Sequence, residues 1–254
     1  MGLRSSPAMS LPEIIRPEPP WQAGLRAARA NLIPGLLVQA VMIATVLAYF
    51  YVPSTREIFD TLGSWKERWG YLYSAVSAIL AGAVIPEILR IAVFQKGRLL
   101  RRNLGNFVFA ACYWGISGMQ VDLLYRLQGV WFGTEGDFAT VVKKVLVDQF
   151  LFCPLLAAPQ AAFLYDWKQL GFARRHLRGF ASADFYRRAV LPTLFATWGV
   201  WIPIVAALYS LPPLLQIPLF SLALSLWVML FTWMSEQRVA EAPATPCADP
   251  CGGT

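Results

Sequence analysis

Long apolar runs dominate this sequence, and their length constrains the fold more than any other feature. They lie at 32–52, 71–95, 104–127, 141–165, 189–211 and 214–235. Each is close to the ~20 residues that a helix needs to cross the hydrocarbon core of a bilayer. The sequence therefore predicts an all-α, polytopic membrane helix bundle with about six spanning helices.

The composition supports a membrane protein over a soluble one. Of the 254 residues, 57% are hydrophobic and only 15% are charged, whereas soluble domains average about 25% charged residues. The formal net charge of +7 is typical of loops that are held on the cytoplasmic side of a membrane. We therefore expect the lipid bilayer to be the main partner of the chain, and we expect no binding of nucleic acid.

The chain divides into three segments. Residues 1–31 lack the apolar core of a signal peptide, and they predict a cytoplasmic or interfacial segment. Residues 32–235 form the predicted transmembrane domain, and the tail at 236–254 is expected to be disordered from its composition. Within the domain, 166–188 alternates arginines with apolar side chains, which predicts an amphipathic helix in the membrane interface.

The basic residues predict an orientation for the bundle. Clusters of lysine and arginine precede the first apolar run and follow the second and the fourth. The polar loops expected at 53–70 and 128–142 are nearly balanced in charge. With six spans every basic cluster falls on one face, as the positive-inside rule requires. The last two runs form a tight helical hairpin, because the Pro212–Pro213 pair stops a helix.

Polar and ionisable residues inside the apolar runs are the candidate pore or polar-network residues, because a charge that faces lipid is costly. They are Glu87, Arg90, Gln120, Asp122, Arg126, Lys143, Lys144, Asp148 and Gln149. Each acid has a base three or four residues away on the same helix face, where the two can pair. The expected pairs are Glu87 with Arg90, Asp122 with Arg126, and Asp148 with Lys144.

Asp122 and Asp148 are expected at similar depth. At a rise of 1.5 Å per residue, each lies about 7.5 Å from the same membrane face. Antiparallel helices joined by a short loop usually pack together, so the two carboxylates should lie near one cavity mouth. One interpretation is a charged ring on a solute path, with Gln120 and Gln149 as neutral neighbours. The other is two independent salt bridges that hold the hairpin together.

Several short motifs carry a resemblance to a known family. The most specific is KKVLVDQFLFCP at 143–154, and others lie at 115–126, 198–212 and 227–235. These motifs resemble those of the Mpv-seventeen family, also called the 22-kDa peroxisomal membrane protein family, over 71–235. The matching residues are Gly118, Tyr125, Lys143, Lys144, Asp148, Gln149, Phe152, Pro154, Trp201, Pro203, Pro212 and Trp227.

The match is divergent, and it does not fix the source as bacterial or eukaryotic. Met119 stands where the family has a proline, and the first run at 32–52 has no counterpart. The resemblance implies a multipass protein through which small solutes pass by a weakly selective channel. It implies the plasma membrane if the source is bacterial, and the mitochondrial inner or peroxisomal membrane if it is eukaryotic.

A structural membrane bundle, or an interaction scaffold whose charges pair internally, is the alternative function. An enzyme is not expected, because the sequence contains no nucleophile elbow, phosphate loop or histidine base. No cofactor or metal is expected either, since the chain has a single histidine and histidines are the usual ligands. The sequence leaves the solute and any homo-oligomer open.

Overall fold

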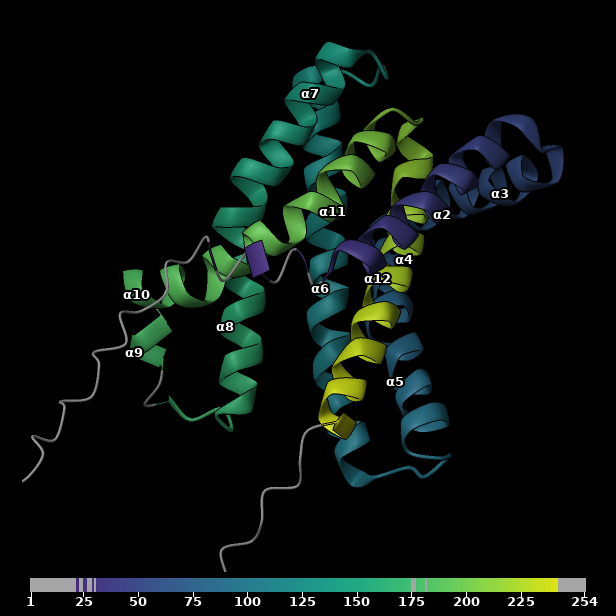
Figure 1. The fold of residues 1–254 in the computed structure, drawn as a ribbon. Coiled ribbons are helices and arrows are strands. Elements are labelled where there is room, and N and C mark those ends of the chain that lie inside the picture. Colours follow the sequence, from purple (N-terminus) through teal and green to yellow (C-terminus); the bar gives the residue numbers. More distant parts are fainter. Residues whose placement is uncertain are drawn as a thin grey trace, which may run out of the picture.

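The computed structural model describes residues 22, 25–26, 29, 31–174, 177–180 and 182–241. Every regular element in these residues is a helix (Figure 1). Five of the described helices are long and apolar enough to cross a membrane. They are Leu32–Tyr51, Tyr71–Phe94, Arg101–Phe132, Ala183–Tyr209 and Pro213–Leu230. The predicted all-α architecture with several membrane spans is therefore confirmed for the described part of the chain.

The helices follow one another closely, and in the described ranges four π-helical segments, labelled η, interrupt the α-helical winding. The elements of the N-terminal half are α2 (Leu32–Tyr51), α3 (Pro53–Trp69), α4 (Tyr71–Ile79), η1 (Leu80–Val84), α5 (Ile85–Leu89), η2 (Arg90–Phe94) and α6 (Arg101–Phe132). Those of the C-terminal half are α7 (Phe138–Val147), η3 (Asp148–Ala157), α8 (Ala158–Gln169), α9 (Leu177–Phe180), α10 (Ala183–Phe185), η5 (Tyr186–Val190), α11 (Leu191–Tyr209) and α12 (Pro213–Glu241).

The segment 53–70, expected as a polar loop, is instead the amphipathic helix α3. It begins at Pro53, whose fixed φ suits the first helical turn. Its buried residues, Phe59, Gly63 and Lys66, recur at the spacing of one helix face. That face packs against α12 while α3 folds back beside α2 (Figure 1). The charges on the other face gave this helix the composition of a loop.

The predicted fourth run, 141–165, lies in α7, η3 and α8, which follow one another without a break over 138–169. Asp137 caps this segment, because its carboxylate accepts hydrogen bonds from the N–H groups of Ala139 at 3.0 Å and Thr140 at 3.2 Å. The segment is not one of the five helices named above. Length and composition thus give five candidate spans among the described residues, where about six were expected.

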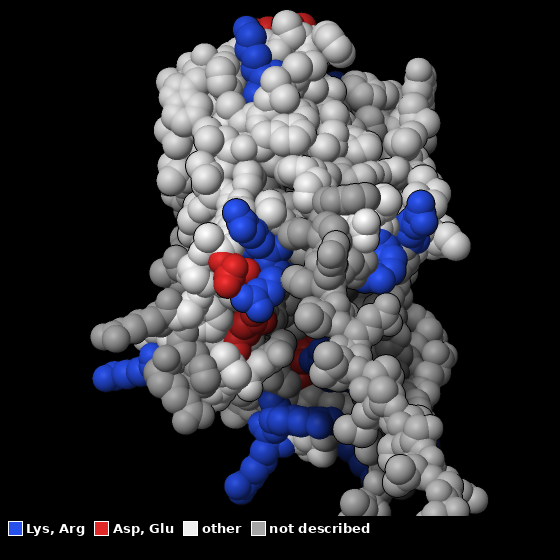
Figure 2. Space-filling model, turned by 60° about the vertical axis from the view of Figure 1, so that its left-hand side comes forward, with Lys and Arg blue, Asp and Glu red and all other residues white. Residues whose placement is uncertain are grey.

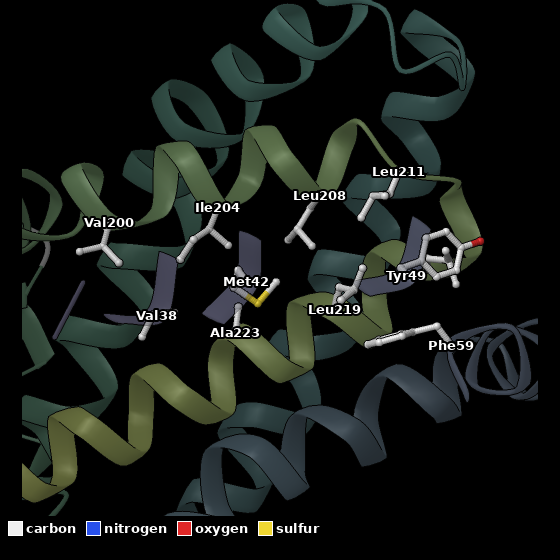
Figure 3. Close-up of a cluster of buried hydrophobic side chains, with 11 residues drawn as sticks. Val38, Met42, Tyr49, Phe59, Val200, Ile204, Leu208, Leu211, Leu219 and Ala223 are labelled. Atoms are coloured by element: carbon white, nitrogen blue, oxygen red, sulfur yellow. The ribbon is translucent and has the colours of Figure 1, made fainter. Parts of the chain in front are cut away.

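The main apolar core lies where α2, α3, α11 and α12 meet (Figure 3). Its buried members are Val38, Met42, Tyr49, Phe59, Val200, Ile204, Leu208, Leu211, Leu215, Leu219 and Ala223. Gly35 brings α2 close to α11, because a Cβ at this position would collide with the Val200 side chain. The first span, which the family resemblance does not cover, is therefore an integral part of the bundle.

The outer surface of the spans is apolar. Large hydrophobic side chains are exposed on several of them, among them Ile33, Phe50 and Leu104, and Leu155 of η3 is exposed as well. In the face shown in Figure 2, a broad uncharged area lies above most of the lysines and arginines. An apolar surface of this extent marks a region that contacts a membrane. The chain is therefore an integral, multipass membrane protein whose spans contact lipid.

Two expected segments differ in the structure, and one lies mainly outside it. The helix predicted over 166–188 is divided: α8 ends at Gln169, two short helices follow, and 183–188 already belongs to the span that continues through α11. The tail predicted from 236 begins within α12, which continues to Glu241, and 242–254 lies outside the described residues. Most of 1–31 lies outside them as well.

Candidate functional site

A cavity of about 290 Å³ lies inside the bundle. The second span, α6, the η3–α8 segment, α11 and α12 all contribute to its wall. The wall is mainly apolar and aromatic, with Tyr113, Trp114, Tyr125, Phe152, Trp198, Trp201, Phe220 and Trp227. Its amide groups come from Gln120 and Gln149, and its aliphatic hydroxyl groups from Ser117, Thr193 and Thr197. Among the described residues that line the cavity, Asp148 supplies the one carboxylate, and none is a lysine, arginine or histidine.

Asp148 is buried and is held by three uncharged donors. The Tyr209 hydroxyl donates to Oδ2 at 2.7 Å, and the Gln149 amide donates to Oδ1 at 3.0 Å. The Cys153 thiol lies 3.6 Å from Oδ1. A carboxylate offers about four lone-pair sites. These three partners therefore leave room for one further donor at Asp148.

The expected ion pair between Lys144 and Asp148 is not formed. Lys144 is only 2% exposed, and its Nζ lies 5.7 Å from the centre of the Tyr209 ring. The hydroxyl of the same tyrosine is bound to Asp148. Tyr209 thus stands between the two charges, with its ring toward the ammonium and its hydroxyl toward the carboxylate. Lys143, the other member of the lysine pair, is exposed on α7.

Asp122 lies in a second polar network with two cations. Lys66 Nζ donates to its Oδ2 at 2.7 Å, and Ser74 Oγ donates to the same oxygen at 2.8 Å. Arg126 Nε donates to Oδ1 at 3.1 Å, so the predicted pair with Arg126 is confirmed. The Arg126 guanidinium also lies 4.8 Å from the centre of the Tyr71 ring. Burial lowers the pKa of Lys66, while the hydrogen bond and the charge of Asp122 oppose that shift.

The close approach of α4 to α6 assembles this network. A Cβ at Gly118 would lie 2.5 Å from both Ala78 Cβ and the Ser74 carbonyl oxygen, so glycine is required for this contact. Asp122 does not line the cavity, whereas Asp148 does. The two carboxylates therefore do not share the cavity: Asp122 is bound by Lys66 of α3, Ser74 of α4 and Arg126 of α6, whereas Asp148 lines the cavity wall.

Glu87 belongs to a third polar group. Arg90 Nη1 donates to its Oε2, as the spacing of three residues predicts, and the Asn103 amide donates to Oε1. Asn103 Oδ1 in turn accepts from the backbone N–H of Leu100 at 2.8 Å, at the start of α6. Glu87 therefore joins the end of the second span to the beginning of the third.

A proline in α11 leaves a backbone carbonyl without its helical partner. Pro203 has no N–H, so the Gly199 carbonyl four residues earlier loses the donor that an α-helix would supply. Gln39 of α2 donates to this oxygen at 3.0 Å and to the Val200 oxygen at 3.1 Å. An unpaired carbonyl inside a membrane is costly. This contact therefore stabilises both the proline in its helix and the α2–α11 interface.

Two prolines near the cavity free carbonyls in the same way. In the π-helical register an N–H bonds the carbonyl five residues earlier, so Pro154 frees the Gln149 carbonyl and Pro159 frees the Pro154 carbonyl. Trp198 Nε1 donates to the Gln149 oxygen at 3.1 Å, and the Tyr186 hydroxyl donates to the Pro154 oxygen at 3.0 Å. Donors from the following span thus fix the winding of η3.

Most of the remaining motif residues meet at the cavity. Gly118, Tyr125, Phe152, Trp201 and Trp227 all line it, together with Gln120, Asp148 and Gln149. The Trp201 and Trp227 rings lie 6.4 Å apart between centroids, and Tyr125 packs at 5.0 Å against the ring of Tyr209, the residue that binds Asp148. Pro212 lies in the turn between α11 and α12, where its carbonyl accepts from Leu215. Residues far apart in the sequence thus form one wall.

Sequence reasoning missed three residues of these networks. Lys66 was missed because α3 was expected as a loop, and Asn103 because it lies outside the apolar run that was assigned to α6. Ser74 lies within the apolar run at 71–95, where a serine carries no charge that would mark it. Tyr209 falls within a recognised motif, but nothing in the sequence indicated that it would bind Asp148. Among the described residues, no group of three or more His, Cys, Asp or Glu could hold a metal.

The fold and the cavity together define a class, that of all-helical integral membrane proteins with several spans. Comparison with family models, with curated proteins and with solved structures finds no match. What the chain does must therefore be argued from its own residues.

Proposed function

We propose that this chain is a six-span membrane protein that lets small solutes cross the bilayer by way of the cavity beside Asp148. One observation carries the proposal. Several polar residues of the apolar runs and several residues of the family-like motifs, which are spread from 118 to 227 in the sequence, line the same cavity. The family that these motifs resemble is implicated in such passage, which makes the chain a divergent relative in this proposal.

The sixth span in this proposal is the segment made of α7, η3 and α8. These elements have 10, 10 and 12 residues, 32 in all, and a spanning helix needs about 20. In Figure 1 the segment runs alongside α6 for much of its length. Six spans also gather the basic loops on one side of the membrane, in agreement with the positive-inside rule.

The cavity is the part of the bundle best suited to a solute. Glu87 and Asp122 already have Arg90, Lys66 and Arg126 as cationic partners, so their charges are used within the fold. Asp148 has uncharged partners and faces the cavity. Intramembrane ionisable residues that line a cavity commonly mark a solute path.

Solute efflux from liposomes tests this proposal. The purified protein is reconstituted in liposomes loaded with a mixture of small labelled solutes, and their release is compared with that from empty liposomes. Ala161 lines the cavity, so Ala161→Phe should fill it and slow the release. Ala44 is exposed on α2, and Ala44→Phe is the matched control that should leave release unchanged. Efflux no faster than from empty liposomes would refute the proposal.

A structural role is the second candidate, and the network around Asp122 favours it. There Lys66, Ser74 and Arg126 all bind one buried carboxylate and tie α3, α4 and α6 together. A protein that is fully folded in liposomes but releases no solute, while it loses stability when Asp122 is replaced, would have this role.

A further inference from the structure

We infer that the cavity binds a monovalent organic cation with a small apolar body, such as an aromatic or alkyl ammonium. This inference rests on the proposed function, since it names the class of solute for the same site. Three features of the cavity carry it: the sign of the charge on its wall, the unused hydrogen-bonding capacity of Asp148, and the aromatic side chains around it.

The charge on the wall is negative. Asp148 is the carboxylate of the lining, and no lysine, arginine or histidine is found in the lining that the described part of the chain forms. The nearest candidate cation in the sequence, Lys144, lies over the Tyr209 ring, 5.7 Å from its centre, and forms no ion pair with the carboxylate. A charge in the bilayer interior that has no opposite charge beside it is costly. A cationic ligand would supply the missing charge.

The contacts of Asp148 leave a place for such a ligand. Its three donors are a phenol, an amide and a thiol, and they stabilise a carboxylate without neutralising it. About four lone-pair sites are available on a carboxylate, so one remains for an ammonium N–H or for direct charge contact. The Tyr209 and Gln149 contacts also hold the carboxylate in place, so little order would have to be gained on binding.

The aromatic wall suits the rest of the ligand. Tyrosine and tryptophan faces attract a cation that lies within about 6 Å of the ring centre, and Trp198 and Trp201 line the cavity with Tyr125. The apolar surface of the same rings accommodates an alkyl or aryl body. The volume of about 290 Å³ lies at the lower limit of the ~300–1,000 Å³ typical of ligand pockets. The ligand is therefore small, of the size of one substituted ring.

Binding in nanodiscs tests this inference independently of transport. The full-length protein is placed in zwitterionic nanodiscs, and binding of benzyltrimethylammonium is compared with that of neopentylbenzene, its uncharged analogue of the same shape, after subtraction of empty nanodiscs. We expect the cation to bind at least about tenfold more tightly, because charge and cation–π contacts act on it alone. Asp148→Asn should reduce this preference to the part that the cation–π contacts supply. Equal binding of the two probes to the wild type would overturn the inference.

A second pair of variants keeps the test valid if Asp148→Asn does not fold. Gln120 lines the cavity and is outside the Asp148 hydrogen bonds. Gln120→Lys places a cation in the wall and should abolish binding of benzyltrimethylammonium, whereas Gln120→Met, of similar length and no charge, should retain the preference. A preference that survives Gln120→Lys would overturn the inference. Cation binding without efflux would refute transport alone, and efflux without cation preference would refute the ligand class alone.

Discussion

Replacement of Lys66 by methionine should destabilise the protein strongly. Lys66 Nζ lies 2.7 Å from Asp122 Oδ2, and both side chains are at most 5% exposed. Removal of one partner of such a buried pair leaves the other charge uncompensated, at a cost of about 3–5 kcal/mol. Arg126 remains 3.1 Å from the other oxygen of Asp122, but its side chain is half exposed. We therefore expect a loss at the lower limit, about 3 kcal/mol.

A double-mutant cycle isolates the pair. The free energy of unfolding is measured in mixed micelles with increasing SDS, with tryptophan fluorescence as the signal, for Lys66→Met, Asp122→Asn and the double variant. The double variant leaves no buried charge unpaired, so it should recover much of the lost stability. A coupling energy of about 2 kcal/mol is expected for two groups in direct contact.

The pH dependence supplies an independent check on Lys66. Burial lowers its pKa from the ordinary value of 10.5. Between the lowered pKa and 10.5 the unfolded chain therefore binds more protons than the folded one, so the free energy of unfolding rises with pH in that window. Lys66→Met removes this group, so the free energy of unfolding of the variant should rise less with pH in the alkaline range.

Lys143→Met is the matched control for Lys66→Met, because Lys143 is exposed on α7. The Arg188–Asp184 pair provides a second control, since its side chains are 77% and 71% exposed and such surface pairs contribute about 0–1 kcal/mol. If Lys66→Met costs no more than Lys143→Met, the buried pair does not stabilise the fold and the reasoning is wrong.

Three further predictions follow from the contacts at the helix ends, the proline-freed carbonyl and the topology. Hydrogen bonds from the first turn of α7 lower the pKa of Asp137, so the stability that Asp137 contributes should be lost as pH falls through that pKa. Asp137→Ala should therefore weaken the fall in the free energy of SDS unfolding at acid pH, while Asp137→Asn should keep the helix cap. Gln39→Leu should cost about 1–3 kcal/mol in the same assay, because the Gly199 carbonyl is left unpaired, and unchanged stability would contradict this. In the six-span topology, cysteines at Ser54 and Gly179 should be labelled by an impermeant maleimide from opposite faces; labelling of both from one face would exclude it.

Local ion pairs could be predicted from the sequence because they depend only on helix geometry. Glu87 with Arg90 and Asp122 with Arg126 are three and four residues apart and form in the structure as expected. The pair of Lys144 with Asp148 has the same spacing and does not form. Its competitor, Tyr209, lies 61 residues away in sequence from Asp148, and no local rule could bring it there.

The positions of freed carbonyls could be predicted as well, but not their partners. A proline inside a helix identifies the carbonyl that loses its donor. The donor itself comes from wherever the bundle brings one, and Gln39 lies 160 residues from Gly199. Apolar length likewise predicted the spans, whereas α3 was missed because its burial depends on α12, a contact far along the chain.

The cavity wall shows why the site itself was only partly predictable. A period of 3.6 residues would place Asp148, Leu151 and Leu155 on one helix face, yet both leucines are largely exposed on the outer surface. The lining instead repeats at 148–149, 152–153 and 157–158, a spacing of four to five residues that belongs to the wider π-helical turn. The same winding brings Cys153, five residues on, to Asp148. Because Pro154 and Pro159 lack the N–H groups for this register, Trp198 and Tyr186 must supply them from the next span. The face that Asp148 presents to the cavity is thus set by contacts between spans, which the period of a single apolar run does not contain.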